Sequence, residues 1–574
     1  MPRHRAFRLF ALAVGSALAM TPACPGWADT AQPETAPDNA GAYLAARLAA
    51  ANNDFTAAAY WFEKALLSDP KNPTLLEGAV TSQLALGAID TAAAYGQILL
   101  DTGSHSQIAY IAVLAGDAKA GNFAKVLKDQ TAGNSVGSLV DKLVVAWSEL
   151  GIGKMSEALA DFDKVTSGQG TAAFGLYHKA LALASTGDFE GADKLLSGPG
   201  SEGTQQLRRA VVARLQILSQ LERDPDAVAL LDKVFGTRLD LSLTDLRARL
   251  VAGETLPYDV ARTATEGLAE VFFTLATALN DQADQTYVLL YARIATALRP
   301  DHVEAQMLSA GLLANLGQND QAIAAFATVP ANDPAYVAAQ IGMADVSIRA
   351  GRPDDAVVLL QKLATQKHDD LSVQTALGDA LRRQGHCDQA VMAYDTAIAL
   401  LPRPEPGNWP MFYKRAGCEA ALNDWPAAQA DFIAALKLDP TEPRLLNELG
   451  YTYVDRGENL DEALKMIQQA VAGSPNSGYI VDSLAWAYFR MGRYADAVAP
   501  QEKASKLMPV DPVVTDHLGD IYWMVGRKRE AQFQWRRALS FNPDPKDRGR
   551  IIHKLDVGLD KVLSEEKAAA ANGN

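Results

Sequence analysis

Residues able to carry out chemistry are few in this chain and lie far apart. The 574 residues include eight histidines and three cysteines. No two histidines stand three or four positions apart, the spacing that puts two ligands on one helix face. Beyond the first thirty residues, the histidines are His105, His178, His302, His368, His386, His517 and His553. This scatter favours solvated turns and helix faces over a metal or catalytic site.

The motifs of common catalytic sites are missing from the sequence. It has no HExxH, GxSxG or Walker motif, and no strand followed by GxGxxG. The nearest match, Gly151-Ile152-Gly153-Lys154, lacks the upstream glycine of a phosphate-binding loop and the Ser or Thr after its lysine. We therefore predict that the protein is not an enzyme and has no catalytic residues, metal ligands or cofactor.

The cysteines show none of the spacings that hold zinc, but two of them can be neighbours. Cys387 and Cys418 lie 31 residues apart, in adjacent helical hairpins of the repeat described below. Two interpretations stay open: a disulfide, which an oxidising compartment would favour, or two buried free thiols.

The first 28 residues are typical of a secretory signal peptide. Three arginines precede an apolar run over residues 9–20, which is too short to span a bilayer of about 30 Å. Cleavage after Ala28, followed by a linker over 29–38, fits the small residues there. Cys24, preceded by Ala23, offers lipidation as the alternative. We expect a periplasmic protein, attached to the outer membrane if Cys24 carries lipid.

The net charge of −15 argues against a nucleic-acid partner, since such proteins need a basic face that releases counterions. The elements that position any binding residues follow from a repeat of 34 residues. Its markers are an Ala that opens a second helix, a Gly five residues earlier, a Pro twelve residues later and a small residue twelve earlier. The Ala series is Ala58, Ala92, Ala158, Ala192, Ala322, Ala356, Ala390, Ala463, Ala497 and Ala531.

Each marker has a mechanical purpose in a helix-turn-helix unit. The Gly ends the first helix with positive φ, the Pro stops the second helix, and the paired small residues allow close approach. The pattern predicts an all-α chain of about 13 stacked hairpins. We place one solenoid over 39–235, an irregular joint over 236–262 and a second solenoid over 263–545. A capping helix and a frayed tail are expected over 546–574.

These features resemble the tetratricopeptide repeat (TPR) family, which implies a right-handed α-solenoid. The segments LNELGYTYVDRGENLDEALKMIQQAV, GYIVDSLAWAYFRMGRYADAVAPQEKA and VTDHLGDIYWMVGRKREAQFQWRRAL are similar to the C-terminal repeats of exported proteobacterial TPR proteins. That group includes an outer-membrane lipoprotein that serves as adaptor of a periplasmic carboxyl-terminal processing protease. The resemblance implies a non-enzymatic adaptor that presents substrates to such a protease. An assembly scaffold for an outer-membrane or secretion complex is the alternative.

Positions 5, 9, 12 and 13 of each first helix line the concave surface of such a solenoid. In the last three units they form an acidic strip with interleaved aromatics, suited to an extended peptide with apolar side chains and a basic charge. We predict a protein-binding site at Asn447, Tyr451, Asp455, Asp482, Trp486, Phe489, Arg490, Asp516, Asp520 and Trp523. The other interpretation is that some of these aromatics only pack between neighbouring units.

Nine bases between Arg527 and Lys554 stand against three acids. A solvated face at helix ends explains part of this cluster, and contact with anionic lipid or an acidic partner is the alternative. Membrane contact is expected only through this cluster or through a lipid on Cys24.

Labelling with a palmitate analogue tests the fate of Cys24. We expect equal labelling of the wild type and of Cys24→Ala, because cleavage after Ala28 removes the cysteine. A label that disappears in Cys24→Ala would show that the protein is lipidated.

Overall fold

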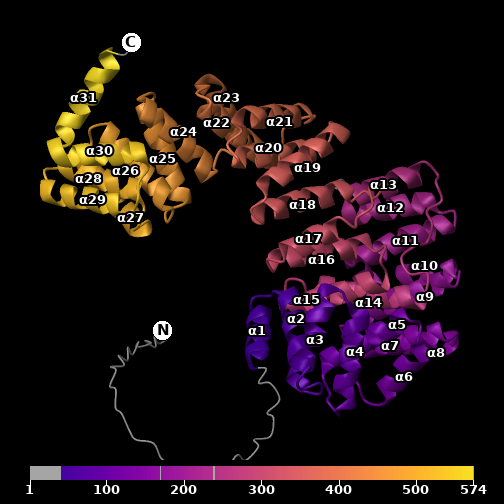
Figure 1. Cartoon of the computed structure of the whole chain (residues 1–574). Helices are drawn as coiled ribbons and strands as arrows, with labels where there is room; N and C mark the ends of the chain where they lie inside the picture. Colours follow the sequence, from indigo (N-terminus) through magenta and orange to yellow (C-terminus); the bar gives the residue numbers. More distant parts are fainter. Residues whose placement is uncertain (1–39, 169, 237–238, 573–574) are drawn as a thin grey trace, which may run out of the picture.

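The structure, a computed structural model, describes residues 40–168, 170–236 and 239–572. The signal peptide predicted over 1–28, including Cys24, and the linker over 29–38 lie outside these residues. Within the described ranges, every regular element is a helix (Figure 1). None of these helices is both long enough and apolar enough to cross a membrane.

The first half of the chain contains fifteen α-helices and one 3-10 helix within the described ranges. They are α1 (Ala40–Ala51), α2 (Phe55–Leu66), α3 (Pro73–Leu86), α4 (Ile89–Asp101), α5 (Gln107–Lys119), α6 (Phe123–Thr131), α7 (Ser138–Gly151), α8 (Met155–Thr166), α9 (Ala172–Ser185), α10 (Phe189–Ser197), η1 (Glu202–Gln206), α11 (Arg208–Gln220), α12 (Asp224–Phe235), α13 (Leu241–Val251), α14 (Ala264–Leu279) and α15 (Gln285–Leu298).

The second half continues in the same way. Its helices are α16 (Val303–Asn315), α17 (Asn319–Phe326), α18 (Tyr336–Arg349), α19 (Pro353–Gln366), α20 (Leu371–Arg383), α21 (Cys387–Ala399), η2 (Pro406–Asn408), α22 (Trp409–Ala421), α23 (Trp425–Leu438), α24 (Pro443–Arg456), α25 (Leu460–Gly473), α26 (Gly478–Arg490), α27 (Tyr494–Leu507), α28 (Pro512–Met524), α29 (Lys528–Ser540), α30 (Pro545–Val557) and α31 (Leu559–Asn572).

The repeat markers occupy the positions that their chemistry requires. The marker glycines, Gly317 and Gly351 among them, have positive φ at the ends of first helices, where a Cβ would be strained. The marker alanines are buried, and Gly378 approaches the ring of Tyr394 so closely that a Cβ would lie 2.7 Å from it. The predicted all-helical solenoid is therefore confirmed.

The first solenoid is filled by helices from beyond the joint. The predicted joint over 236–262 contains α13 and an extended stretch, after which the chain turns back. Helix α14 packs on α5, α7 and α9, and α15 packs on α3 and α5, all of them first helices of N-terminal hairpins (Figure 1). One continuous hydrophobic core joins these helices from Phe55 to Val346. The inner surface of the N-terminal hairpins is thus covered by the chain itself.

Close contacts hold α14 and α15 in this position. A Cβ on Gly267 would lie 2.3 Å from the indole of Trp147, so the backbone of α14 rests directly on that ring. The Thr265 hydroxyl donates to the Ala118 carbonyl at 3.1 Å, and the Arg293 guanidinium donates to the Ala85 carbonyl at 3.0 Å. Each bond ties one of the inserted helices to a carbonyl in the last turn of an N-terminal helix.

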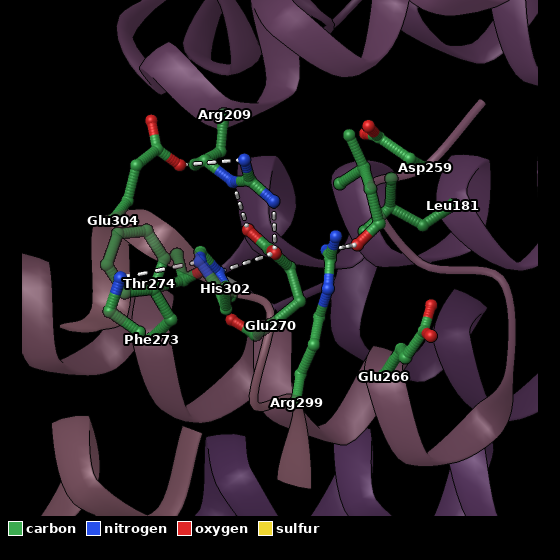
Figure 2. A network of polar contacts seen from close by, with 12 residues as sticks. Leu181, Arg209, Asp259, Glu266, Glu270, Phe273, Thr274, Arg299, His302 and Glu304 are labelled. Carbon is green, nitrogen blue, oxygen red and sulfur yellow. Dashed lines mark hydrogen bonds and ion pairs between the residues drawn. The ribbon is translucent and has the colours of Figure 1, made fainter. Parts of the chain in front are cut away.

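A buried charge completes the junction (Figure 2). The Glu270 carboxylate on α14 is fully buried and receives two hydrogen bonds from Arg209 on α11, at 3.0 and 2.8 Å. The Tyr177 hydroxyl on α9 donates to it at 2.8 Å, and His302 before α16 lies 3.4 Å away. Burial opposes ionisation, but Arg209 and His302 outweigh it and hold the pKa of Glu270 well below its ordinary value. Glu270 thus joins α9, α11, α14 and the start of α16.

The C-terminal cap differs from the single capping helix and frayed tail expected over 546–574. The helix is interrupted at Gly558, where φ is +85° and a Cβ would lie 2.6 Å from the Trp523 ring. Two helices, α30 and α31, result, and α31 continues through the stretch predicted to fray. Ile551 and Leu559 belong to the same core as Trp535, so the break lets both helices cover the last hairpin.

Replacing Glu270 tests the junction. Glu270→Ala leaves the buried Arg209 guanidinium undercompensated, which should lower the stability of α14 by about 3–5 kcal/mol, measured by hydrogen exchange. The double change Arg209→Met with Glu270→Leu should recover most of the loss. Asp320→Ala, which breaks an exposed pair with Arg352, is the control and should cost less than about 1 kcal/mol. Equal effects of Glu270→Ala and Asp320→Ala would contradict this interpretation.

Candidate protein-binding groove

An open stretch of inner surface runs over the first helices α18, α20, α22 and α24. The residue that follows the marker small residue lies on this surface in each helix: Asp345, Asp379, Gly417 and Tyr451. Because these helices repeat one register, their side chains at this position form a row along the groove.

The first cavity of the groove, cavity A, has a volume of about 900 Å³ and lies between α18 and α20. Apolar side chains from both helices line it, with Met411 from α22. Leu239 and Leu241, just before and at the start of α13, line it from the joint between the solenoids. Its larger apolar residues are Leu239, Leu241, Ile341, Ile348, Leu360, Leu371 and Met411.

Carboxylates dominate the charged lining of cavity A. They come from Asp240, Asp345, Asp369, Asp370 and Asp379, against the single base Arg383. The Arg383 guanidinium lies 3.6 Å from the Asp345 carboxylate, and both side chains are about half exposed. An exposed ion pair at this distance is weak, so the Asp345 carboxylate remains available to a basic side chain of a partner.

A second cavity, cavity B, has a volume of about 550 Å³ and lies between α22 and α24. Trp409, Tyr413 and Phe432 supply aromatic walls, and burial raises the pKa of the Tyr413 hydroxyl to about 12. Its charged lining is mainly basic, namely Arg382, Lys414 and Arg444 against Glu448. Gly417 lies in its wall, with no atom within 4 Å of the place where a Cβ would be.

One ion pair separates the two cavities. Asp379 on α20 accepts a hydrogen bond from the Tyr394 hydroxyl at 2.6 Å and one from the Lys414 ammonium at 2.7 Å. Both carboxylate oxygens are thereby held. Asp379 lines cavity A and Lys414 lines cavity B, so the sign of the charge changes at this pair.

The predicted strip on α26 and α28 is not an open surface. Trp486 and Phe489, expected to be exposed, are 9% and 6% exposed. The Trp486 ring stacks at 4.8 Å on Phe489 and at 4.0 Å on His517. Asp482 accepts from His517 at 3.0 Å and from Gln501 at 2.5 Å. The expectation of exposure is therefore wrong for these residues, which pack between hairpins.

The last hairpin, α28 and α29, is covered by α30, which takes the place that the next repeat would occupy. The fully buried Lys554 donates to Asp516 at 2.6 Å and to Asp520 at 2.7 Å, and Trp535 donates to Asp520 at 2.8 Å. The half-buried Trp523 donates to Asp560 on α31 at 2.8 Å. Asp516, Asp520 and Trp523 thus hold the cap and do not face an open groove.

The predicted binding residues on α24 differ in how far they are exposed. Asn447 is buried, and no hydrogen-bond partner is found for its carbonyl oxygen within the described chain. Tyr451 is half-buried, and burial raises its pKa to about 12. Asp455 is exposed, and its backbone carbonyl accepts from Arg490 at 3.0 Å. Tyr451, Asp455 and Arg490 therefore remain at least partly accessible, but none of them lines cavity A or cavity B.

Three bases of the C-terminal basic cluster, Arg527, Arg550 and Lys554, form close ion pairs within the chain. Besides Lys554, Arg550 binds Glu566 at 2.7 Å and Asp520 at 3.3 Å, and Arg527 binds Glu502 at 3.1 Å and Glu530 at 2.5 Å. The cluster therefore presents less free positive charge than the sequence indicates.

The two cysteines are neighbours, as the repeat register predicts. Cys387, at the start of α21, and the buried Cys418, on α22, both line cavity B. Burial, reinforced by the Cys387 side chain, raises the pKa of the Cys418 thiol to about 12. Both are free thiols in this structure, and a disulfide in an oxidising compartment stays a prediction.

Comparison with known protein families identifies the repeat. Five segments, some of them overlapping, match the tetratricopeptide repeat family: 289–337, 312–370, 375–443, 413–478 and 447–512. The chain thus carries tetratricopeptide repeats in the part that forms the groove. Such stacked hairpins present extended concave surfaces to protein partners, so these repeats are typical of a scaffold for protein–protein interaction.

Individual relatives resemble the chain over limited stretches or at low identity. A TPR repeat-containing protein of Pseudomonas aeruginosa, PA4667, is 31% identical over 115 residues, which cover 20% of this chain and 19% of that protein. The matched stretch is therefore about a fifth of that protein's length. One chain of the crystal structure of the APC/C hetero-tetramer Cut9–Hcn1 aligns over 91% of this chain and 96% of its own length at 15% identity, with a TM-score of 0.37. Yeast Tom70 aligns over 92% and 96% at 13% identity, with a TM-score of 0.33.

Cavities A and B escaped prediction from the sequence. The sequence predicts a binding site only in the last three units, where aromatics are dense at the inner positions of the repeat. The same positions in the preceding units hold Ile341, Asp345, Asp379 and Tyr413, so the register itself would have located the open groove.

Two groups in the C-terminal cap should make its stability depend on pH. Burial and the neighbouring Asp520 raise the pKa of Asp516 to about 6. Burial opposes protonation of His517, but Asp482, Asp516 and Asp520 outweigh it and raise its pKa. Lys554 and Arg550 also face this group of carboxylates.

Both folded-state pKa values exceed the unfolded values of about 3.9 and 6.5, so the protonated forms stabilise the cap. This stabilisation is complete below each unfolded pKa and is lost as the pH rises through the folded pKa. Protection of α28 and α30 amides, corrected for intrinsic exchange, should therefore fall as the pH rises from about 4 to about 6, through the pKa of Asp516. It should fall further above about pH 6.5, through the raised pKa of His517. His517→Gln should flatten the upper part of this decline, whereas exposed His553→Gln should not. Protection that rises over this range would contradict the assignment.

Proposed function

We propose that the protein is a non-enzymatic adaptor that binds extended segments of partner proteins in the groove over α18–α24. The observation that supports this most is the pair of cavities on this stretch of inner surface. The inner surface of the N-terminal hairpins is occupied by α14 and α15, and that of the last hairpin is held against α30. The groove between them combines apolar floors with charged rims, which suits peptide recognition.

We place this adaptor in the bacterial cell envelope, where it would present substrates to a periplasmic carboxyl-terminal processing protease. The signal-like residues 1–28 and the resemblance of the C-terminal repeats to exported adaptors support the proposal. The alternative is an assembly scaffold for an outer-membrane or secretion complex. The large continuous solenoid serves either purpose, because it leaves one groove for a partner segment and a long outer surface for other proteins.

Site-specific photocrosslinking tests this function. A photoreactive amino acid replacing Gly417 points into cavity B without a clash, because the place of its Cβ is open. The control replaces Met392, which is 69% exposed on α21, a second helix. We expect protein adducts in intact cells from position 417 and far fewer from position 392.

The identity of the adducts separates the two functions. A processing protease or its substrates among the adducts would support the adaptor, whereas only subunits of an envelope complex would favour the scaffold. Equal adduct yields from positions 417 and 392 would contradict a binding groove at α18–α24.

A further inference from the structure

The groove carries charge of opposite sign in its two halves. Cavity A is lined by five carboxylates and one arginine, and cavity B by three bases and one carboxylate. The pair Asp379–Lys414 lies at the boundary, with 2.7 Å between its charged atoms. A partner segment that crosses both cavities therefore meets negative charge first and positive charge second.

The apolar surfaces of the two cavities also differ. Cavity A has aliphatic walls, including Ile341 and Ile348, whereas cavity B is aromatic, with the Arg444 guanidinium 5.0 Å above the Trp409 ring. Aliphatic side chains fit the first, and a ring can stack in the second. Each cavity thus offers an apolar pocket beside charges of one sign.

We propose, building on the function above, that the groove selects an extended protein segment with two charge-coded anchors. The first anchor is an aliphatic side chain flanked by Lys or Arg, which enters cavity A. The second is an aromatic side chain flanked by Asp or Glu, which enters cavity B. The order of charges fixes the direction of the segment, with its basic end at α18 and its acidic end at α24.

The spacing of the anchors follows from the repeat. The first helices of neighbouring hairpins lie about 10 Å apart along the groove. The centre of cavity A, between α18 and α20, is therefore about 20 Å from the centre of cavity B, between α22 and α24. An extended chain rises about 3.3 Å per residue, and about six residues therefore separate the anchors.

Fluorescence anisotropy with the full chain tests the proposal. The probe is a labelled peptide with Lys-Leu-Lys and Glu-Phe-Glu joined by a Gly/Ser spacer of that length. Asp345→Lys, at an exposed side chain, should weaken binding about tenfold, because it sets like charges opposite each other. A second peptide, with Glu-Leu-Glu in place of Lys-Leu-Lys, should bind the variant better than it binds the wild type. Arg444→Glu should weaken the first probe similarly, and a peptide ending in Lys-Phe-Lys should restore binding.

The matched control is Asp320→Lys on α17, whose side chain is 86% exposed and does not line either cavity. It makes the same change in net charge and should leave the affinity unchanged. An equal loss in Asp320→Lys, or no rescue by the charge-reversed peptides, would overturn the proposal. Failure of the probe to bind while position 417 still crosslinks to partners would overturn the charge order alone. Failure of both would remove the proposed function as well.

Discussion

The structure depends on the neutralisation of one buried carboxylate. Glu270 is fully buried, and an ionised carboxylate in such a place is tolerated only when opposite charge and hydrogen bonds surround it. Arg209, Tyr177 and His302 supply these contacts from three other parts of the chain. The carboxylate can be satisfied only when α14 lies in the N-terminal groove, so the junction favours one arrangement of the two solenoids.

This arrangement determines where a partner can bind. With α14 and α15 inside the first solenoid, its inner surface is core, continuous with that of the following hairpins. At the other end, Lys554 reaches between Asp516 and Asp520 and fixes α30 over the last hairpin. Between these two closed ends, α18–α24 keep their inner positions accessible. The first residues of α13 line cavity A, so the junction of the solenoids also shapes the groove.

The sequence predicts the local unit well because its markers act over short distances. Positive φ at Gly351 and the contact of Gly378 with Tyr394 are properties of single hairpins, and the 34-residue period exposes them. The repeat pattern does not predict that α14 packs back against the N-terminal hairpins. Glu270 and Arg209 are 61 residues apart, and such charges look like surface residues in a helical pattern. For the same reason the sequence predicts an open strip on α26 and α28. The repeat pattern does not show that Lys554 and His517 pack against the residues of this strip.

Hydrogen exchange of the full chain with and without a captured partner tests most directly whether the open groove is the binding site. Exchange is read at each helix, so one experiment compares the three inner surfaces. We expect new protection in α18, α20, α22 and α24, with α3, α5 and α7 and with α26 and α28 unchanged. New protection centred on the N-terminal hairpins or on the last two hairpins would contradict the claim that their inner surfaces are closed.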